Sequence, residues 1–200
     1  MSPVVESYAE LAARILRQPA RLGRTRLIAV DGPSGAGKTV FASRLAGALD
    51  AATPVLHTDD LLDGWADQFT FWPRLEEWVL SPLRAGRPAR YRRYDWTRGS
   101  FGPGWTVLPP APVVIVEGVS SARAVIAAEL SLAVFVTAPA ELCRDRTLAR
   151  DGAALAAQLT LWRRGERAHF AADRTAERAD LVVDGATGSA LQGAAFVRLR

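Results

Sequence analysis

The sequence contains a single cysteine, Cys143, and a single lysine, Lys38, among its 200 residues. One cysteine cannot form a disulfide within the chain, so we expect a reducing, cytoplasmic location. No apolar run approaches the roughly 20 residues that a helix needs to span a bilayer. The first residues, MSPVVESYAE, carry glutamates and lack the ordered basic, apolar and cleavage regions of a signal peptide. We therefore expect no membrane partner.

Acidic residues are slightly scarcer than basic ones, 21 against 25, and every basic residue except Lys38 is an arginine. The sequence has no dense basic run and no basic segment interleaved with aromatics, so nucleic acid is not expected as a partner. Scattered arginines suit a phosphorylated small molecule at least as well. The hydrophobic share of 49% is ordinary for a globular protein, and 200 residues predict one domain.

Short apolar runs that alternate with segments of helical periodicity predict an α/β fold, with a parallel sheet covered by helices on both faces. We expect strands at 27–30, 53–58, 113–118, 132–136 and 181–185. We expect helices at 4–17, 38–49, 73–83, 121–129, 140–150 and 153–172. The stretch 84–112 is rich in Gly, Pro, Arg and aromatic residues, which predicts a long irregular section. Only the last dozen or so residues are weakly specified.

A glycine-rich loop stands between the first strand and the helix at 38–49. It reads GPSGAGKT and fits the phosphate-binding pattern G-x-x-x-x-G-K-[ST]. Glycines let successive backbone N–H groups curl around an anion, and the following helix adds its positive end. An ordinary glycine turn is the alternative, but the strand before the loop and the helix after it are what phosphate binding requires. The predicted nucleotide-binding residues are Gly32, Pro33, Ser34, Gly35, Ala36, Gly37, Lys38 and Thr39.

The end of this loop and the acid of a later strand predict how ATP and Mg²⁺ would be bound. Lys38 can reach the β- and γ-phosphates, and the hydroxyl of Thr39 can ligate Mg²⁺. Glu117 ends VVIVE, the most apolar of the expected strands. This place would put Glu117 beside the loop, able to hold Mg²⁺ directly or through water. Its alternative role is to cap the region of Ser120.

Two aspartates, Asp59 and Asp60, follow the second expected strand in HTDDLLDGW. Loops at the carboxyl ends of parallel strands converge on the ligand crevice of such a sheet. A carboxylate there could accept the proton of an attacking hydroxyl, a role that we assign to Asp59 in preference to Asp60. The alternative is that either aspartate simply caps the next helix.

Two arginines in ELCRDRTLARDG, Arg146 and Arg150, are four residues apart and therefore share one face of a helix. Arginines on a mobile helical lid could close over the transferring phosphoryl group and offset its charge. Because arginine is common on solvated helices, a purely surface role is the alternative.

Together these motifs resemble the uridine kinase family of P-loop kinases, which also includes phosphoribulokinase and pantothenate kinase relatives. The matching segments, from about 26 to 185, are GPSGAGKT, TDDLLDGW, YDW, VIVEG, RTLARDG and ERADLVVDG. The resemblance implies the P-loop NTP hydrolase fold, with five parallel strands in the order 2-3-1-4-5 and a helical lid. We accordingly expect one kinase domain, 1–200, with an N-terminal helix (1–25), a core (26–185), an acceptor-site insertion (84–112) and a lid (140–165).

The reaction implied by this resemblance is transfer of the ATP γ-phosphate to a hydroxyl of a small molecule, with Mg²⁺. Asp59 falls on the family's catalytic base, and Glu117 falls on its magnesium-associated acid. Arg146 and Arg150 fall on the lid arginines, which with Asp59 and Lys38 complete the expected catalytic set. The expected acceptor-binding residues are Asp60, Tyr94, Asp95 and Arg98.

The sequence departs from the family on the acceptor side. Leu61 and Leu62 stand where the family usually has an aromatic pair, and Arg98 stands where nucleoside kinases place a histidine. Besides a nucleoside, the acceptor could therefore be a pantothenate-like alcohol, a sugar or a specialised metabolite. The rival classes are a regulatory ATPase without an acceptor and a nucleic-acid-end kinase, and self-association into a homo-oligomer stays open.

Overall fold

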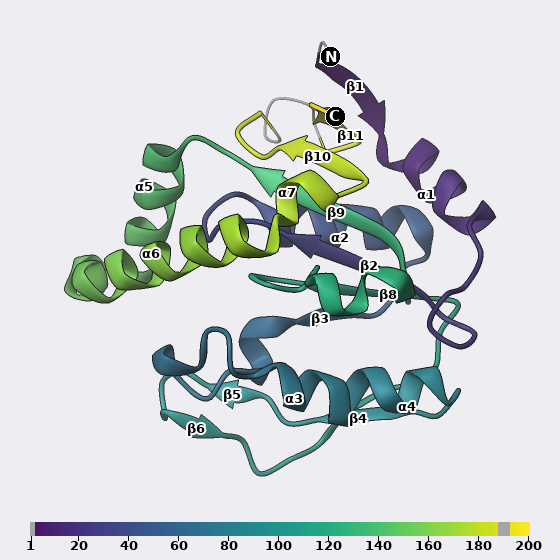
Figure 1. Ribbon diagram of the computed structural model, residues 1–200, viewed down its shortest axis with the longest axis horizontal. Helices are drawn as coiled ribbons and strands as arrows, with labels where there is room; N and C mark the ends of the chain where they lie inside the picture. Colours follow the sequence, from purple (N-terminus) through teal and green to yellow (C-terminus); the bar gives the residue numbers. More distant parts are fainter. Residues whose placement is uncertain (1–2, 188–192) are drawn as a thin grey trace.

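The structure is a computed structural model that describes residues 3–187 and 193–200. At its centre lie the five expected strands, which are β2 (Arg26–Asp31), β3 (Val55–His57), β8 (Val113–Glu117), β9 (Leu130–Thr137) and β10 (Leu181–Asp184). They pair in parallel, in the order β3-β8-β2-β9-β10 (Figure 1). Numbered along the chain, this order is 2-3-1-4-5, so the predicted order of the parallel strands is confirmed.

Two antiparallel strands extend this sheet beyond β10, so the predicted count of five strands is too low. β11 (Ala195–Arg198) pairs with β10, and β1 (Val4–Ser7) pairs with β11 at the edge. The prediction of a weakly specified tail is therefore wrong for β11, while residues 188–192 of that tail lie outside the described part of the chain. β1 and β11 come from opposite ends of the chain, and so distant a pairing leaves no local pattern in the sequence.

The first helix is shorter than predicted because β1 takes its first residues. It begins at Tyr8, as α1 (Tyr8–Arg17), and not at residue 4. The Ser7 hydroxyl accepts a hydrogen bond from the backbone N–H of Glu10 at 3.1 Å, and the Glu10 carboxylate accepts one from Ser7 N–H at 3.1 Å. This reciprocal capping box fixes where the helix starts.

Each face of the sheet carries its own hydrophobic core. On one face, Ile28 of β2 packs in a core with the buried residues of α1 and of α2 (Lys38–Leu49), the helix predicted at 38–49. On the opposite face, Leu27 belongs to a core that includes the helical segment at 72–84. Neighbouring residues of β2 thus point to opposite faces, as the period of a strand requires. The expected covering of both faces is confirmed.

The helical segment at 72–84 is one continuous run with a widened middle. It consists of α3 (Trp72–Leu75), the π-helical turn η3 (Glu76–Leu80) and α4 (Ser81–Arg84). Pro82 has no backbone N–H to donate to the preceding turn, which accounts for the change of winding before it. The helix predicted at 73–83 is therefore present, although it is not a regular α-helix.

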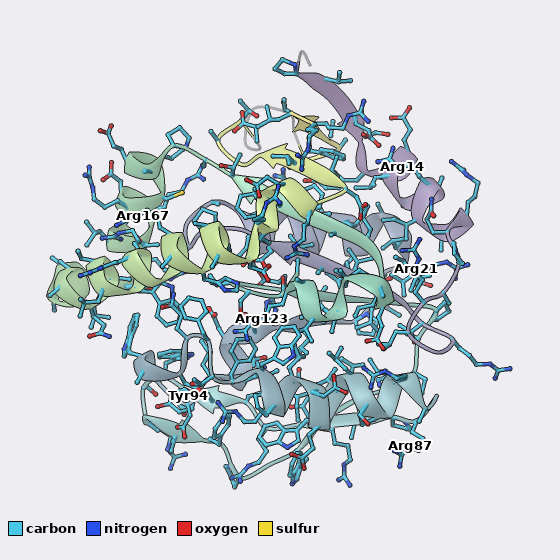
Figure 2. All side chains as sticks on the ribbon, in the orientation of Figure 1. Arg14, Arg21, Arg87, Tyr94, Arg123 and Arg167 are labelled. Carbon is cyan, nitrogen blue, oxygen red and sulfur yellow. The ribbon has the colours of Figure 1, made fainter. Side chains whose placement is uncertain are left out.

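The section at 84–112 is more ordered than predicted. It contains two short antiparallel pairs, β4 (Ala89–Tyr91) with β7 (Thr106–Leu108) and β5 (Tyr94–Asp95) with β6 (Ser100–Phe101). In Figure 2, Arg87 and Tyr94 lie at opposite ends of the lower layer formed by this section and α3–α4, so the section spans the width of that layer.

The predicted lid region forms two helices beyond the carboxyl ends of the parallel strands, on the left of Figure 1. They are α5 (Ala140–Asp151) and α6 (Ala156–Asp173), joined by the short η5 (Ala153–Leu155) and followed by α7 (Thr175–Arg178). The helix predicted at 121–129 is instead the shorter 3-10 helix η4 (Ala124–Glu129). Among the described residues, no helix combines the length and the apolar character that crossing a membrane would require.

Candidate active site

The glycine-rich loop joins the end of β2 to the start of α2, as its sequence predicts. Two of its glycines have backbone angles and surroundings that no other residue could adopt without strain. Gly32 has φ of +136°, and a Cβ there would lie 2.1 Å from the carbonyl oxygen of Val136. Gly35 has φ of +82°, and a Cβ there would lie 2.4 Å from the carbonyl oxygen of Cys143 in α5. The loop is therefore packed against both β9 and the lid helix.

A cavity of about 670 Å³ opens beside this loop, a size that suits a nucleotide. Lys38 lines it and is 8% exposed, with its Nζ donating a hydrogen bond across the loop to Pro33 O at 3.1 Å. The predicted residues that line the cavity are Ser34, Gly35, Gly37, Lys38, Thr39, Asp59, Glu117, Arg146 and Arg150. The structure thus brings together five of the eight predicted phosphate-loop residues with the predicted metal, base and lid residues, from four separate segments of the chain. Gly32, Pro33 and Ala36 do not line the cavity.

Thr39 and Glu117 meet in this cavity as the predicted metal pair. The Thr39 hydroxyl donates to Glu117 Oε1 at 3.1 Å, although 78 positions separate the two residues. Oxygen ligands are what Mg²⁺ prefers, so this pair fits the ion. In the described residues, no group of three or more His, Cys, Asp and Glu side chains could hold a metal by itself. Two protein ligands completed by water and phosphate oxygens are the usual pattern for Mg²⁺.

His57 is a second neighbour of Glu117. Its Nδ1 contacts Glu117 Oε1, and this hydrogen bond raises the pKa of His57. His57 is the last residue of β3 and Glu117 is the last residue of β8, so their contact joins the ends of the two strands. Asp59 follows His57 by two residues. The contact orients the acid that faces the phosphate loop.

Asp59 lies at the start of η1 (Thr58–Leu61), directly after β3. Solvent reaches its side chain through the cavity, but the surrounding walls desolvate the carboxylate and raise its pKa. The charge of Glu117 raises this pKa further, while Lys38 and Arg150 lower it. Asp59 is therefore a carboxylate of raised basicity that sits among the charges of the phosphate-binding side.

The two lid arginines differ in what they contact. Arg146 donates from Nη1 to the backbone oxygens of Gly35, at 3.1 Å, and Gly185, at 3.0 Å, which ties α5 to the phosphate loop. Arg150 is ion-paired with its neighbour Asp151 at 2.6 Å. Its charge also acts on Asp59 and Glu117. Arg146 thus serves as an anchor of the loop, and Arg150 is the lid arginine whose charge reaches the carboxylates of the cavity.

The predicted acceptor-binding residues lie on or near β5, outside the lining of this cavity. Asp60 is ion-paired with Arg93 at 3.0 Å. Asp95 accepts hydrogen bonds from the backbone N–H groups of Thr97 and Arg98, so its Oδ1 holds a turn. Arg98 is exposed. This group is therefore a neighbouring cluster and does not share the walls of the nucleotide cavity.

Aromatic side chains join that cluster to Asp59. The Tyr94 ring contacts Trp96 and Phe101, with centroids 5.1 Å and 5.3 Å away. Trp96 donates from its indole N–H to the backbone oxygen of Asp59 at 3.3 Å. Trp65, from η2 (Trp65–Asp67), packs against Trp96 with a centroid distance of 5.3 Å. An acceptor that approached Asp59 from this side would meet an aromatic wall.

The sequence matches no protein-family model and no curated protein. Among solved structures, the chain is similar to a Bacillus stearothermophilus protein described as a possible uridine kinase, with a TM-score of 0.64 and 19% identity over 88% of this chain and 96% of that chain. It is also similar to a Silicibacter sp. TM1040 protein provisionally named a fructose transport system kinase, with a TM-score of 0.52 and 22% identity over 98% and 97% of the two chains. The chain has the fold of the uridine kinase-like P-loop kinases.

Two buried acids of this P-loop kinase fold were not predicted from the sequence. Asp31 ends β2, is fully buried and accepts hydrogen bonds from the backbone N–H groups of Gly32, Ser120 and Ala122 at 2.7 to 2.9 Å. Burial raises its pKa to about 6. An acid at the end of an apolar strand, directly before the glycine loop, was the available signal. Glu166 of α6 is 2% exposed and contacts Ser34, 132 residues away, and no local pattern marks it.

Proposed function

We propose that the protein is an ATP- and Mg²⁺-dependent kinase that transfers the γ-phosphate to a hydroxyl of a small molecule. One observation carries this proposal, which is that a single cavity holds the phosphate loop with Lys38, the oxygen pair of Thr39 and Glu117, and the carboxylate of Asp59. A phosphate cradle alone would serve any nucleotide-binding protein. A carboxylate of raised pKa beside the cradle adds the group that an acceptor hydroxyl needs.

The proposed step moves one phosphoryl group and one proton. Asp59 accepts the proton of the acceptor hydroxyl as the hydroxyl oxygen forms a bond to the γ-phosphorus. The bond between that phosphorus and the β–γ bridging oxygen breaks in line with the attack, and ADP leaves with the bonding electron pair. The products are ADP, the phosphorylated acceptor and a proton that Asp59 passes to solvent through the cavity.

The cationic side chains stabilise the charge that develops during this transfer. Lys38 is held over the loop and would contact the β- and γ-phosphates, and the charge of Arg150 acts on Asp59. Thr39 and Glu117 would hold Mg²⁺, which when bound offsets the charge of the triphosphate. The N–H groups at the start of α2 add their partial positive charge to the same place.

The acceptor is tested by measuring ADP release and product mass with a panel of alcohols. Nucleosides and ketoses stand first in the panel because the two similar structures are named for uridine and fructose, and pantothenate-like alcohols and other sugars follow. We expect one class to give stoichiometric ADP and phosphorylated alcohol, and Lys38→Ala to abolish this turnover. Equal ATP hydrolysis with and without every alcohol would instead favour a regulatory ATPase.

Oligonucleotide ends belong in the same panel as a test of the remaining class. A kinase of nucleic-acid ends would bind oligonucleotides with an affinity that falls steeply as salt rises. We expect no such binding, because the insertion's Arg93 is already paired with Asp60 and Arg92 donates to the backbone oxygen of Gly102. Phosphorylation of an oligonucleotide end above all small alcohols would overturn the small-molecule assignment.

A further inference from the structure

The second helix of the predicted lid region, α6, reaches the phosphate loop through one buried carboxylate. Glu166 Oε1 accepts a hydrogen bond from Ser34 N–H at 2.9 Å and from the Ser34 hydroxyl at 2.5 Å. Trp162, one helical turn earlier, donates from its indole N–H to the same oxygen at 2.9 Å and to the Ser34 hydroxyl at 3.1 Å. One carboxylate oxygen therefore takes three hydrogen bonds, and two of them come from a single residue of the loop.

Burying the Glu166 carboxylate in this arrangement costs free energy, which calls for a role that offsets the cost. Removing a carboxylate from water is unfavourable, and Glu166 is 2% exposed. Its negative charge also opposes any anion bound in the same loop. An uncharged acceptor could satisfy the same donors without either cost, but hydrogen bonds to a carboxylate are shorter and stronger than those to a neutral oxygen. The charge is therefore understandable if Ser34 must be held firmly in place.

Ser34 stands where the loop begins its curl. The next residue, Gly35, has the positive φ that turns the chain, and Gly37 and Lys38 follow at the start of α2. Their N–H groups can surround a phosphate only if the residue before the turn keeps its orientation. Glu166 Oε1 holds both the backbone N–H and the hydroxyl of Ser34, and therefore limits the rotation of this residue.

We propose that Glu166 is a positioning residue of the phosphate loop, holding Ser34 so that the loop keeps the shape that accepts a triphosphate. This inference rests on the proposed function, because it assigns Glu166 a part in nucleotide binding. Glu166 contacts the loop and not the phosphate itself. Its effect on the reaction passes through Ser34.

The same helix also holds the acceptor side of the cavity. Gln68 donates from its side-chain amide to the backbone oxygen of Trp162 at 3.1 Å, and the rings of Trp65 and Trp162 pack with centroids 5.5 Å apart. Trp65 in turn packs against Trp96, which is hydrogen-bonded to the backbone of Asp59. Glu166 thus fixes one end of a chain of contacts that runs from the phosphate loop to the base, so its loss should also lower kcat.

The test separates the loop from the rest of the nucleotide by using magnesium tripolyphosphate as the probe, with MgATP beside it, in titration calorimetry. Glu166→Ala leaves the donors of Ser34 and Trp162 without their partner. We expect the affinity for tripolyphosphate and for MgATP to fall about tenfold, the effect of a loss near 1.4 kcal/mol. Glu166→Gln keeps an oxygen acceptor, and we expect it to restore the affinity to within about threefold of the wild type.

Glu6→Ala is the matched control, because Glu6 is another buried glutamate, 8% exposed and paired with Arg14 at 2.5 Å on the edge strand β1. This variant should lose stability and keep its affinity for tripolyphosphate. A folded Glu166→Ala with wild-type or tighter binding would overturn the proposal. If Glu166→Ala does not fold, Ser34→Ala decides, since it removes one hydrogen bond to Glu166 and should weaken tripolyphosphate binding about threefold. Unchanged binding there would also overturn the proposal.

Failure of this inference differs from failure of the proposed function. If the wild type binds neither tripolyphosphate nor MgATP, the proposed kinase itself is wrong. If the wild type binds both and the Glu166 and Ser34 variants bind equally well, the kinase stands and only the positioning role of Glu166 is lost.

Discussion

Asp59 and Glu117 are two carboxylates that line one cavity, and their neighbours differ. Glu117 Oε1 accepts from the Thr39 hydroxyl and contacts His57, so it is fixed next to the phosphate loop. Asp59 is held through its backbone oxygen by Trp96, which leaves its carboxylate at the open cavity. At the scale of single residues, these contacts support the proposal that Glu117 serves the metal and Asp59 serves the acceptor.

Asp59→Asn tests this assignment. The amide cannot accept the proton of the acceptor hydroxyl, so we expect kcat to fall by about 10²-fold or more. The affinity for MgATP, measured by calorimetry, should stay unchanged because the phosphate loop is intact. Asp60→Asn is the neighbouring comparison and should raise KM for the acceptor more than it lowers kcat, since Asp60 pairs with Arg93. An Asp59→Asn enzyme with wild-type kcat would place the base elsewhere.

Arg150→Ala and Arg146→Ala should separate an effect on the reaction rate from an effect on folding stability. Arg150 acts by its charge on Asp59 and Glu117, so its loss should lower kcat by about 10²-fold with little change in the unfolding temperature. Arg146 donates to the backbone oxygens of Gly35 and Gly185, so its loss should destabilise the fold by about 1.5–3 kcal/mol and raise KM for ATP.

Steady-state kinetics and thermal unfolding of the two arginine variants would check both expectations. Arg150→Lys, which keeps the charge, should recover part of kcat. The reverse pattern, in which Arg146→Ala loses kcat at full stability and Arg150→Ala unfolds early, would exchange the two roles.

At the scale of elements, the phosphate loop and α5 approach each other at one glycine. Gly35→Ala would force a Cβ to within 2.4 Å of the Cys143 carbonyl oxygen at a φ of +82°. We expect a loss of stability of about 1–3 kcal/mol, together with weaker MgATP binding. Gly47→Ala is the control, because Gly47 lies in α2 with no atom within 4 Å of an added Cβ and should gain about 0.5–1 kcal/mol. Thermal unfolding and calorimetry measure both variants. An unchanged Gly35→Ala would mean that the loop and α5 separate easily.

The elements that the sequence predicted well are those with a local pattern. The loop residues Gly32 to Thr39 carry their own signature, and β2 and α2 flank them as that signature requires. β1 was missed because it is a four-residue edge strand whose partner, β11, lies at the other end of the chain. β11 was missed because it is equally short. The strand pairs within 84–112 were missed because their strands are only two or three residues long.

At the scale of the whole molecule, two carboxylates of the candidate site were predictable from their places at or just after the ends of expected strands. Glu117 ends β8 and Asp59 follows the last residue of β3 by two positions, and the parallel pairing of these strands brings the two acids together. Glu166 could not be found in this way, because its contact with Ser34 depends on how α6 folds back over the sheet. The different contacts of Arg146 and Arg150 were equally hidden, since helical spacing places both on one face and does not say what that face meets.

Asp31 links the same site to the stability of the whole fold, and its pKa gives a prediction with a definite sign. The carboxyl titrates at about 6 in the folded protein against 3.8 for an ordinary aspartate, because burial outweighs its three backbone hydrogen bonds. The folded state therefore holds a proton that the unfolded state releases between these values. Stability from this group is present at low pH and is lost as pH rises to about 6.

Asp31→Asn removes this titration, so the difference in unfolding free energy between wild type and variant should depend on pH. The wild type should lose up to about 3 kcal/mol relative to Asp31→Asn between about pH 4 and pH 6, and the difference should be constant above pH 7. Denaturant unfolding across this range measures it. Val30→Ala is the control, because it leaves a cavity in the same strand and removes no titrating group. Its unfolding free energy should differ from that of the wild type by an amount that does not change with pH. A flat difference for Asp31→Asn would mean that this carboxylate is charged throughout, held by the N–H groups of the loops that it joins.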